Sequence, residues 1–135
     1  MQTIVLISCA SKKRNHKTKA EHLYISPLFQ KNLAYAKKLK PDKIFILSAK
    51  YGLLDLETEI EPYNVTLNKM VSSEIRAWAE KILVELSKRA NLQEDHFIFL
   101  AGANYRKYLT PYMSSFDVPM EGMPIGKQLQ FLGGL

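Results

Sequence analysis

The sequence predicts an α/β fold, with a single three-layer domain built around a mainly parallel, Rossmann-like sheet. Apolar, β-branched runs that are typical of buried strands alternate with amphipathic stretches that are typical of helices. The strands are expected at residues 3–8, 43–48 and 96–100, and the helices at residues 27–39 and 72–89. A helix between two strands is a crossover connection, which makes the two strands parallel. A length of 135 residues fits one domain, covering residues 1–135, whose core needs no metal or disulfide.

The first half of the chain is predicted to run strand, long loop, helix, strand. Ser26 can cap the helix, Pro27 suits its first position, and Pro41 ends it. The apolar run at residues 43–48 then forms the second strand. Residues 55–70 follow with no clear period, so we expect a long surface loop there, and long loops in compact domains are often functional.

The second half begins with the helix at residues 72–89, whose apolar stripe includes Trp78. Trp78 is therefore expected in the core rather than on a base-stacking surface. Ser72 or Ser73 is expected to cap this helix, with Glu74 in its first turn.

After the third strand, the pattern predicts a helix, a short fourth strand at residues 116–120 and a terminal helix ending at Gly133-Gly134. The buried faces of the two helices are expected to carry Tyr108, Leu109 and Tyr112, and Ile125, Leu129 and Leu132.

The net charge and the cysteine content indicate which kind of partner the protein binds and in which cellular compartment it works. Lys and Arg number 19 against 13 Asp and Glu, a net charge of +6, which favours anionic partners such as nucleic acid or nucleotides. Cys9 is the single cysteine, so no disulfide can form within the chain, which suits a reducing compartment. No run has the length of a signal peptide or a membrane span, so we expect a soluble, cytoplasmic protein with no membrane partner.

Each of the three predicted strands ends in a turn of small residues with a cation nearby. The turns are Ser8-Cys9-Ala10-Ser11-Lys12-Lys13-Arg14, Ser48-Ala49-Lys50-Tyr51-Gly52 and Ala101-Gly102-Ala103-Asn104-Tyr105-Arg106. If the strands are parallel, all three turns lie at one edge of the sheet, where backbone N–H groups favour anions and where open α/β sheets bind ligands. None of the turns matches a P-loop or a dinucleotide-binding fingerprint.

These turns and the segment beside them supply the candidate site residues. The candidates for binding a ligand or its phosphate are Ser8, Cys9, Lys12, Lys13, Arg14, Ser48, Lys50, Gly52, Tyr63, Asn64, Gly102, Tyr105 and Arg106. The candidates for catalysis are Glu61 and Tyr51. Lys12, Lys13, Arg14 and Lys50 are expected to hold phosphate, while Tyr51 and Tyr105 contact a ring.

Each candidate also has a structural interpretation. The basic loop at residues 12–19 can be a solvated surface loop, and the tyrosines can pack between the loops and the core. Cys9 can be a nucleophile beside cations or a small, partly buried thiol. Glu61, followed by the rigid Pro62, can act as an acid or base or can pair with a surface cation. The three histidines lack metal-ligand spacing, so no metal or other cofactor is expected.

Several segments resemble a family of uncharacterised bacterial and phage domains, which is distantly similar to the YaaA peroxide-stress proteins. The resemblance lies in Leu6-Ile7-Ser8-Cys9, Leu23-Tyr24-Ile25-Ser26-Pro27-Leu28-Phe29, Leu47-Ser48-Ala49-Lys50-Tyr51-Gly52-Leu53-Leu54, Glu61-Pro62-Tyr63-Asn64-Val65-Thr66-Leu67, Ala101-Gly102-Ala103-Asn104-Tyr105 and Gly122-Met123-Pro124-Ile125-Gly126-Lys127-Gln128-Leu129. It implies nucleic acid or nucleobases as partners, because YaaA proteins are implicated in DNA binding and related domains occur in enzymes of modified-nucleobase metabolism.

Two functions are therefore expected as alternatives. The first is an enzyme that acts on a nucleotide, a nucleobase or the glycosidic bond of a nucleic acid, as a hydrolase or transferase. Cleavage of an N-glycosidic bond builds positive charge on the sugar, which the carboxylate of Glu61 would stabilise. The second is a non-catalytic DNA-binding stress-response protein of YaaA-like type. The first function needs a concave pocket containing a carboxylate, and the second needs an extended basic surface.

Overall fold

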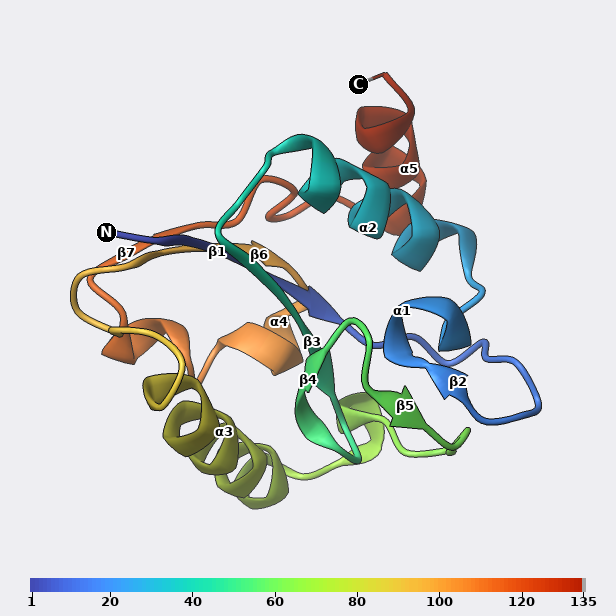
Figure 1. The fold of residues 1–135 in the computed structure, drawn as a ribbon, viewed down its shortest axis with the longest axis horizontal. Coiled ribbons are helices and arrows are strands. Elements are labelled where there is room, and N and C mark those ends of the chain that lie inside the picture. The colour runs from blue at the N-terminus through green and yellow to red at the C-terminus, as the bar shows by residue number, and fades with distance from the viewer. Residues whose placement is uncertain (135) are drawn as a thin grey trace.

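Five strands form the central sheet in the order β4-β3-β1-β6-β7, as a computed structural model of the chain shows (Figure 1). The structure describes residues 1–134. The strands are β1 (Thr3–Ser8), β3 (Lys43–Ser48), β4 (Gly52–Asp55), β6 (His96–Leu100) and β7 (Ser115–Asp117). β1 pairs in parallel with both β3 and β6, and β6 pairs in parallel with β7, whereas β4 is antiparallel to β3. The predicted α/β fold with a mostly parallel sheet is confirmed.

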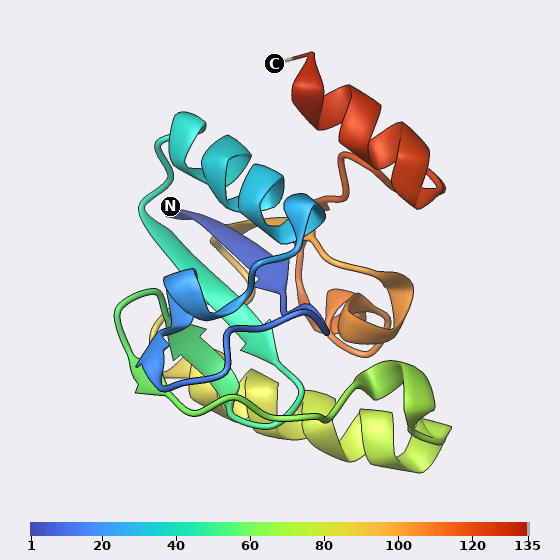
Figure 2. The ribbon, with the colours of Figure 1, turned by 90° about the vertical axis from the view of Figure 1, so that its right-hand side faces the viewer.

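Helices cover both faces of this sheet and make the domain three layers thick (Figures 1 and 2). α1 (Ala20–Leu23), α2 (Pro27–Lys38) and α5 (Ile125–Gly133) lie on one face, and α3 (Ser72–Ser87) and α4 (Ala103–Arg106) lie on the other. Successive residues of a strand point to opposite faces. Ile4 and Leu6 of β1 therefore pack with α3, while Val5 and Ile7 pack with α2.

The two long helices begin for different local reasons. Ser26 caps α2 as predicted, because its hydroxyl accepts the N–H of Phe29 at 3.1 Å. The predicted serine cap of α3 is wrong: the helix begins after Val71, whose N–H donates to the carboxylate of Glu74 at 3.0 Å. Trp78 is buried in the core on the α3 side, as predicted.

The stretch predicted as a turn and a long loop contains short strands. A tight turn after β3 leads into β4, which returns along the edge of the sheet. β5 (Glu59–Ile60) pairs with β2 (Thr18–Lys19) in a separate two-stranded sheet, and a single turn of 3₁₀ helix, η1 (Leu67–Lys69), follows. Strands of two to four residues are too short to establish a period in the sequence, which is why the prediction missed them.

The C-terminal segment departs from its prediction in three places. α4 has a single turn, a 3₁₀ turn η2 (Thr110–Tyr112) follows it, and Tyr112 is 57% exposed rather than buried. The fourth parallel strand is β7, one residue before the predicted start and three residues short of the predicted end. The terminal helix is present, but Ile125 at its first position is 63% exposed.

The order of the strands creates a switch point at the carboxyl ends of β1 and β6. The chain leaves β1 towards α1 and α2 on one face, and it leaves β6 towards α4 on the opposite face. A crevice opens where neighbouring connections diverge in this way, and open α/β sheets bind their ligands there. Within residues 1–134, no helix is both long enough and apolar enough to cross a membrane.

Candidate functional site

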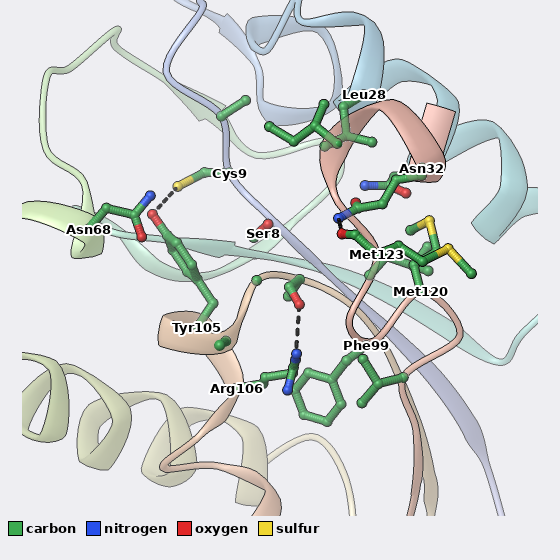
Figure 3. A pocket seen from close by; sticks show the side chains of 18 of the residues that line it. Ser8, Cys9, Leu28, Asn32, Asn68, Phe99, Tyr105, Arg106, Met120 and Met123 are labelled. Carbon is green, nitrogen blue, oxygen red and sulfur yellow. Dashed lines mark hydrogen bonds between the residues drawn. The ribbon is translucent and has the colours of Figure 1, made fainter. Parts of the chain in front are cut away.

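A pocket of about 410 Å³ lies at this switch point, and we call it the switch-point pocket (Figure 3). Its floor and walls come from residues 8–11 after β1, residues 99–103 at the end of β6, and Tyr105 and Arg106 of α4. The segment before η1, the buried side of α2, the segment after β7 and the start of α5 complete it. The pocket therefore joins segments from the whole length of the chain.

The walls of the switch-point pocket are mostly neutral. Leu28, Met120 and Met123 supply apolar surface on one side. Arg106 is the charged residue among the described lining residues, and its guanidinium is already engaged. Its Nε donates to the carbonyl of Ala101 at 3.2 Å, and its Nη1 lies 3.6 Å from the exposed carboxylate of Glu121.

Cys9 places its thiol on the pocket wall. The Sγ atom lies 3.5 Å from the hydroxyl of Tyr105, which also accepts the backbone N–H of Leu67 at 3.4 Å. Because the hydroxyl already accepts one hydrogen bond, its own hydrogen is free to point at the sulfur. Burial raises the pKa of Tyr105, and the neighbouring Cys9 raises it further, so this hydroxyl stays protonated and acts as a donor.

A second polar cluster lies beside the pocket, and we call it the tyrosine cluster: Lys13, Tyr24, Ser48 and Tyr63. The hydroxyls of Tyr24 and Tyr63 lie 2.6 Å apart, and Ser48 Oγ donates to Tyr63 at 2.9 Å. Lys13 Nζ is 4.4 Å from the centroid of the Tyr63 ring, a cation–π distance. Burial lowers the pKa of Lys13 and raises the pKa of Tyr63, and Cys9 adds to the rise at Tyr63. Cys9 therefore lines the pocket and also acts electrostatically on the tyrosine cluster.

The structure divides the predicted binding residues other than Gly52 into three groups. Ser8, Cys9, Gly102, Tyr105 and Arg106 line the switch-point pocket. Lys13, Ser48 and Tyr63 belong to the tyrosine cluster beside it. Lys12, Arg14, Lys50 and Asn64 are exposed outside the pocket. Arg14 Nε donates to the carbonyl of His22 at 2.9 Å, so part of this cation is engaged by the chain itself.

The two predicted catalytic residues also lie outside the pocket. Tyr51 donates its hydroxyl to the backbone carbonyl of Glu61 at 3.3 Å, and its ring packs edge-on against Tyr63. Lys50 Nζ lies 5.3 Å from the centroid of the Tyr51 ring. The side chain of Glu61 is exposed, and no carboxylate is found among the pocket-lining residues within 1–134. A catalytic role for Glu61 stays a prediction.

Gly52 has a clear structural use. Its φ is +79°, in the left-handed region that favours glycine, and it begins β4 next to α3. A Cβ atom here would lie 2.6 Å from Oε1 of Glu85. The backbone conformation of the turn and the close packing against Glu85 both explain why a glycine occurs at this position. Gly52 does not line the switch-point pocket.

The sequence reasoning missed several pocket residues, of which Asn32 is the most informative. Asn32 sits on the buried side of α2 with Phe29 and Ala36, and it is only 5% exposed. A polar residue within the apolar stripe of a helix was the available signal. Met120 and Met123 gave no such signal, because they belong to an irregular segment that only the tertiary fold brings to the pocket.

The other titratable residues do not form a metal site. No group of three or more His, Cys, Asp and Glu side chains within residues 1–134 is placed to hold a metal ion. His96 bonds to Ser115 Oγ at 2.6 Å and to Asp117 Oδ2 at 2.9 Å, at the start of β6. That edge is opposite the switch-point pocket, and the contacts tie β7 to β6.

The fold and the pocket define an α/β domain with a ligand-sized pocket at its topological switch point. Residues 4–134 match the profile of a family of unknown function, DUF6884, so nearly the whole chain belongs to this family. No curated protein and no solved structure matches the chain.

Proposed function

We propose that this protein is an enzyme that binds a nucleobase or nucleotide in the switch-point pocket and acts on it there. The observation that carries the proposal is the pocket itself, because it combines a ligand-sized volume with the protein's only thiol. Its volume of about 410 Å³ lies within the range of roughly 300–1,000 Å³ that is usual for small-molecule sites. Its position at the carboxyl ends of parallel strands is the usual place for such a site.

The chemistry of the walls favours a neutral ring over a phosphate inside the pocket. Met120, Met123 and Leu28 offer apolar contact, and Asn32 and Asn68 offer amides for directional hydrogen bonds. Arg106 and the exposed basic loop at residues 12–19 place positive charge around this edge of the sheet. A nucleotide therefore fits with its base in the pocket and its phosphate towards solvent.

The proposed reaction is cleavage or exchange of a glycosidic bond. Such a reaction needs a carboxylate near the sugar. No described pocket-lining residue carries one, so the candidate is Glu61, whose exposed side chain would have to meet the sugar of the bound ligand outside the pocket. Glu61→Gln is expected to lower the rate by about 10²–10⁴-fold while ligand affinity is kept, as for loss of an acid–base group. Release of free base from nucleosides, followed by chromatography, measures this. Glu59→Gln changes another exposed carboxylate on the same segment and is the matched control. Equal turnover in the two variants would remove Glu61 from the mechanism.

Two built-in reporters allow the binding proposal to be tested without a label. Trp78 is the only tryptophan, and its ring lies edge-on to Tyr105 with 5.6 Å between centroids, so a ligand in the pocket should change its fluorescence. Cys9 is the only cysteine and lies on the pocket wall, so the same ligand should slow its alkylation by iodoacetamide. Nucleobases, nucleosides and nucleoside monophosphates are the ligands to titrate. Binding that changes neither reporter would place the ligand outside the pocket.

The second candidate is non-catalytic nucleic-acid binding of YaaA-like type. The exposed basic loop at residues 12–19 supports it, together with Lys50 stacked over the ring of Tyr51. The distant resemblance to YaaA proteins belongs to this proposal and rests on the sequence segments alone. Titration with DNA and RNA oligonucleotides at two salt concentrations separates the candidates. Salt-dependent binding that leaves Cys9 fully reactive supports the second candidate, whereas binding of a free nucleotide that protects Cys9 supports the first.

A further inference from the structure

Cys9 is the one side chain of the switch-point pocket that can bond covalently to a ligand without a base beside it. The described part of the pocket lining contains no Asp, Glu, His or Lys. The hydroxyls of Ser8, Ser11 and Thr66 therefore have no base to activate them, and burial raises the pKa of Tyr105, so that its hydroxyl stays protonated. A thiol is nucleophilic near neutral pH without such help, so Cys9 is the nucleophile available in this pocket.

Two tyrosines and a lysine act on the sulfur of Cys9. The hydroxyl of Tyr105 lies 3.5 Å from Sγ, and its oxygen already accepts the N–H of Leu67, so its hydrogen can point at the sulfur. Tyr63 and the ammonium of Lys13 also interact electrostatically with Cys9. Hydrogen-bond donors and a nearby cation stabilise a negatively charged sulfur, which is the nucleophilic form of a cysteine.

A separate observation points to a ligand opposite this sulfur. Asn32, in the middle of α2, is only 5% exposed, and its side chain makes no hydrogen bond within residues 1–134. Its Oδ1 is fully buried, whereas its Nδ2 is the amide atom on the pocket side, across the pocket from Cys9 (Figure 3). An amide nitrogen can only donate, so a ligand that fills the pocket meets it with an acceptor such as a carbonyl oxygen.

We propose that Cys9 is a catalytic nucleophile whose Sγ adds to C6 of a uracil base, while Asn32 Nδ2 donates to the C4 carbonyl oxygen of the same base. This inference rests on the proposed function and adds to it the class of base and the residue that reacts. Among the common bases, the pyrimidines offer a thiol a carbon–carbon double bond conjugated with a polar group at C4. Uracil fits Asn32 and cytosine does not, because the amino group at C4 of cytosine would face the amide donor.

The addition needs no oxidant, reductant or second substrate. The thiol proton passes to water, the S–C6 bond forms, and the electron pair of the C5=C6 double bond moves through C4 onto its oxygen. The N–H of Asn32 stabilises the charge that develops on this oxygen. C5 then takes a proton from water as the C4 carbonyl forms again, which gives a 5,6-dihydrouracil thioether, and the reverse steps release the base. While it lasts, the S–C6 bond holds the base in the pocket with its sugar free to meet Glu61 outside.

The first experiment follows the hydrogen at C5 of uridine and needs no variant. Because C5 takes a proton from solvent and then loses one, the wild-type protein in D₂O should replace this hydrogen by deuterium, which proton NMR measures as loss of the H5 signal. Cytidine should exchange at least about tenfold more slowly, because its amino group and Asn32 Nδ2 are both donors. Uridine that protects Cys9 from iodoacetamide but keeps its H5 signal would overturn the inference and leave the proposed function intact. Equal exchange of the two nucleosides would also overturn the inference.

The second experiment removes the thiol. Cys9→Ser keeps the size of the side chain but offers a hydroxyl that no base activates, so the H5 exchange should be lost. The change of Trp78 fluorescence with uridine should remain, which shows that the variant still folds and binds the nucleoside. Exchange at the wild-type rate in this variant would overturn the inference.

The third experiment removes the donor opposite the thiol. Asn32→Leu should lower the rate of H5 exchange by about 10²–10³-fold, the usual effect of removing one donor to a developing oxyanion, with a smaller loss of uridine affinity. Gln2→Leu is the matched control, because Gln2 Oε1 is also buried and unpartnered within residues 1–134, but Gln2 precedes β1 and does not line the pocket. The control should exchange H5 like the wild type, and a wild-type rate in Asn32→Leu would overturn the inference.

The proposed function and this inference fail in different ways. If neither Cys9 alkylation nor Trp78 fluorescence responds to any nucleobase, nucleoside or nucleotide, the proposed function fails and the inference fails with it. If purine nucleosides bind and uridine does not, or if uridine binds without H5 exchange, only the inference fails.

Discussion

At the scale of single residues, the hydroxyl of Tyr105 links the pocket to the core. It approaches Cys9 and also accepts the backbone N–H of Leu67, which is buried. Tyr105→Phe keeps the ring but leaves that N–H without an acceptor. We expect the free energy of unfolding to fall by about 1–3 kcal/mol, the usual cost of an unpaired buried group.

Urea denaturation measures this loss. Tyr112→Phe removes an equivalent hydroxyl from a ring that is 57% exposed, and it should leave the stability nearly unchanged. A loss of the same size in both variants would contradict the role given to the Tyr105 hydroxyl.

The buried tyrosines predict how stability depends on alkaline pH. Burial raises the pKa of Tyr24, Tyr63 and Tyr105 above the value that each has in the unfolded chain. The folded protein therefore keeps these protons to a higher pH than the unfolded chain does. The stability that they contribute is fully present below about pH 10 and is lost as the pH rises from there towards the raised values.

Urea denaturation at a series of pH values above 9 tests this dependence. Tyr63→Phe removes one titrating group, so the fall in stability should become shallower by up to about 1.4 kcal/mol per pH unit. Tyr112→Phe should keep the wild-type slope. An unchanged slope in Tyr63→Phe would show that Tyr63 titrates alike in the folded and unfolded states.

At the scale of elements, the hairpin from β3 to β4 depends on Gly52. Gly52→Ala forces a side chain into the left-handed region and brings a Cβ to 2.6 Å from the carboxylate of Glu85. We expect a loss of about 1–3 kcal/mol from the backbone strain and the displaced side chain.

Gly126→Ala is the internal comparison for this prediction. Gly126 lies in α5 with open space around its Cα, so alanine should stabilise the protein by about 0.5–1 kcal/mol. Thermal unfolding should give a lower melting temperature for Gly52→Ala and a higher one for Gly126→Ala than for the wild type. A stable Gly52→Ala protein would mean that the hairpin tolerates another backbone conformation.

At the scale of the whole molecule, the net charge of +6 raises the question of which basic residues bind nucleic acid. If the basic loop at residues 12–19 binds nucleic acid, the triple variant Lys12→Gln, Lys17→Gln, Lys19→Gln should weaken that binding. The slope of log affinity against log salt should decrease by about 0.7–0.9 for each phosphate that the variant no longer neutralises.

The control removes the same charge elsewhere, from the exposed Lys40, Lys69 and Lys88. Both triple variants should bind free nucleosides like the wild type, because none of these lysines lines the switch-point pocket. Equal losses of nucleic-acid affinity in the two triple variants would show a general charge effect without a dedicated surface.

The sequence by itself determined the strands and helices with a strong period. β1, β3, β6, α2 and α3 lie close to where they were predicted, because each is long enough for burial to impose a repeat of its own. The crossover connections predicted parallel strands, and β1, β3 and β6 are parallel. Parallel strands place the three small-residue turns at the same edge of the sheet, where the strands have their carboxyl ends. Two of these three turns line the switch-point pocket, so the position of this candidate site could be expected from local patterns and this one rule.

Only the tertiary structure decided the composition of the site. The pocket takes Asn32 from α2 and Met120 and Met123 from an irregular segment, and no local pattern records which distant segments will face each other. The tertiary structure also leaves the carboxylate of Glu61 exposed outside the pocket, because Glu61 follows β5, which pairs with β2 in a separate two-stranded sheet. Secondary structure is set largely by neighbours in sequence, whereas a pocket is made by long-range packing. The long helices and strands could therefore be predicted from the sequence, and the residues that line the pocket could not.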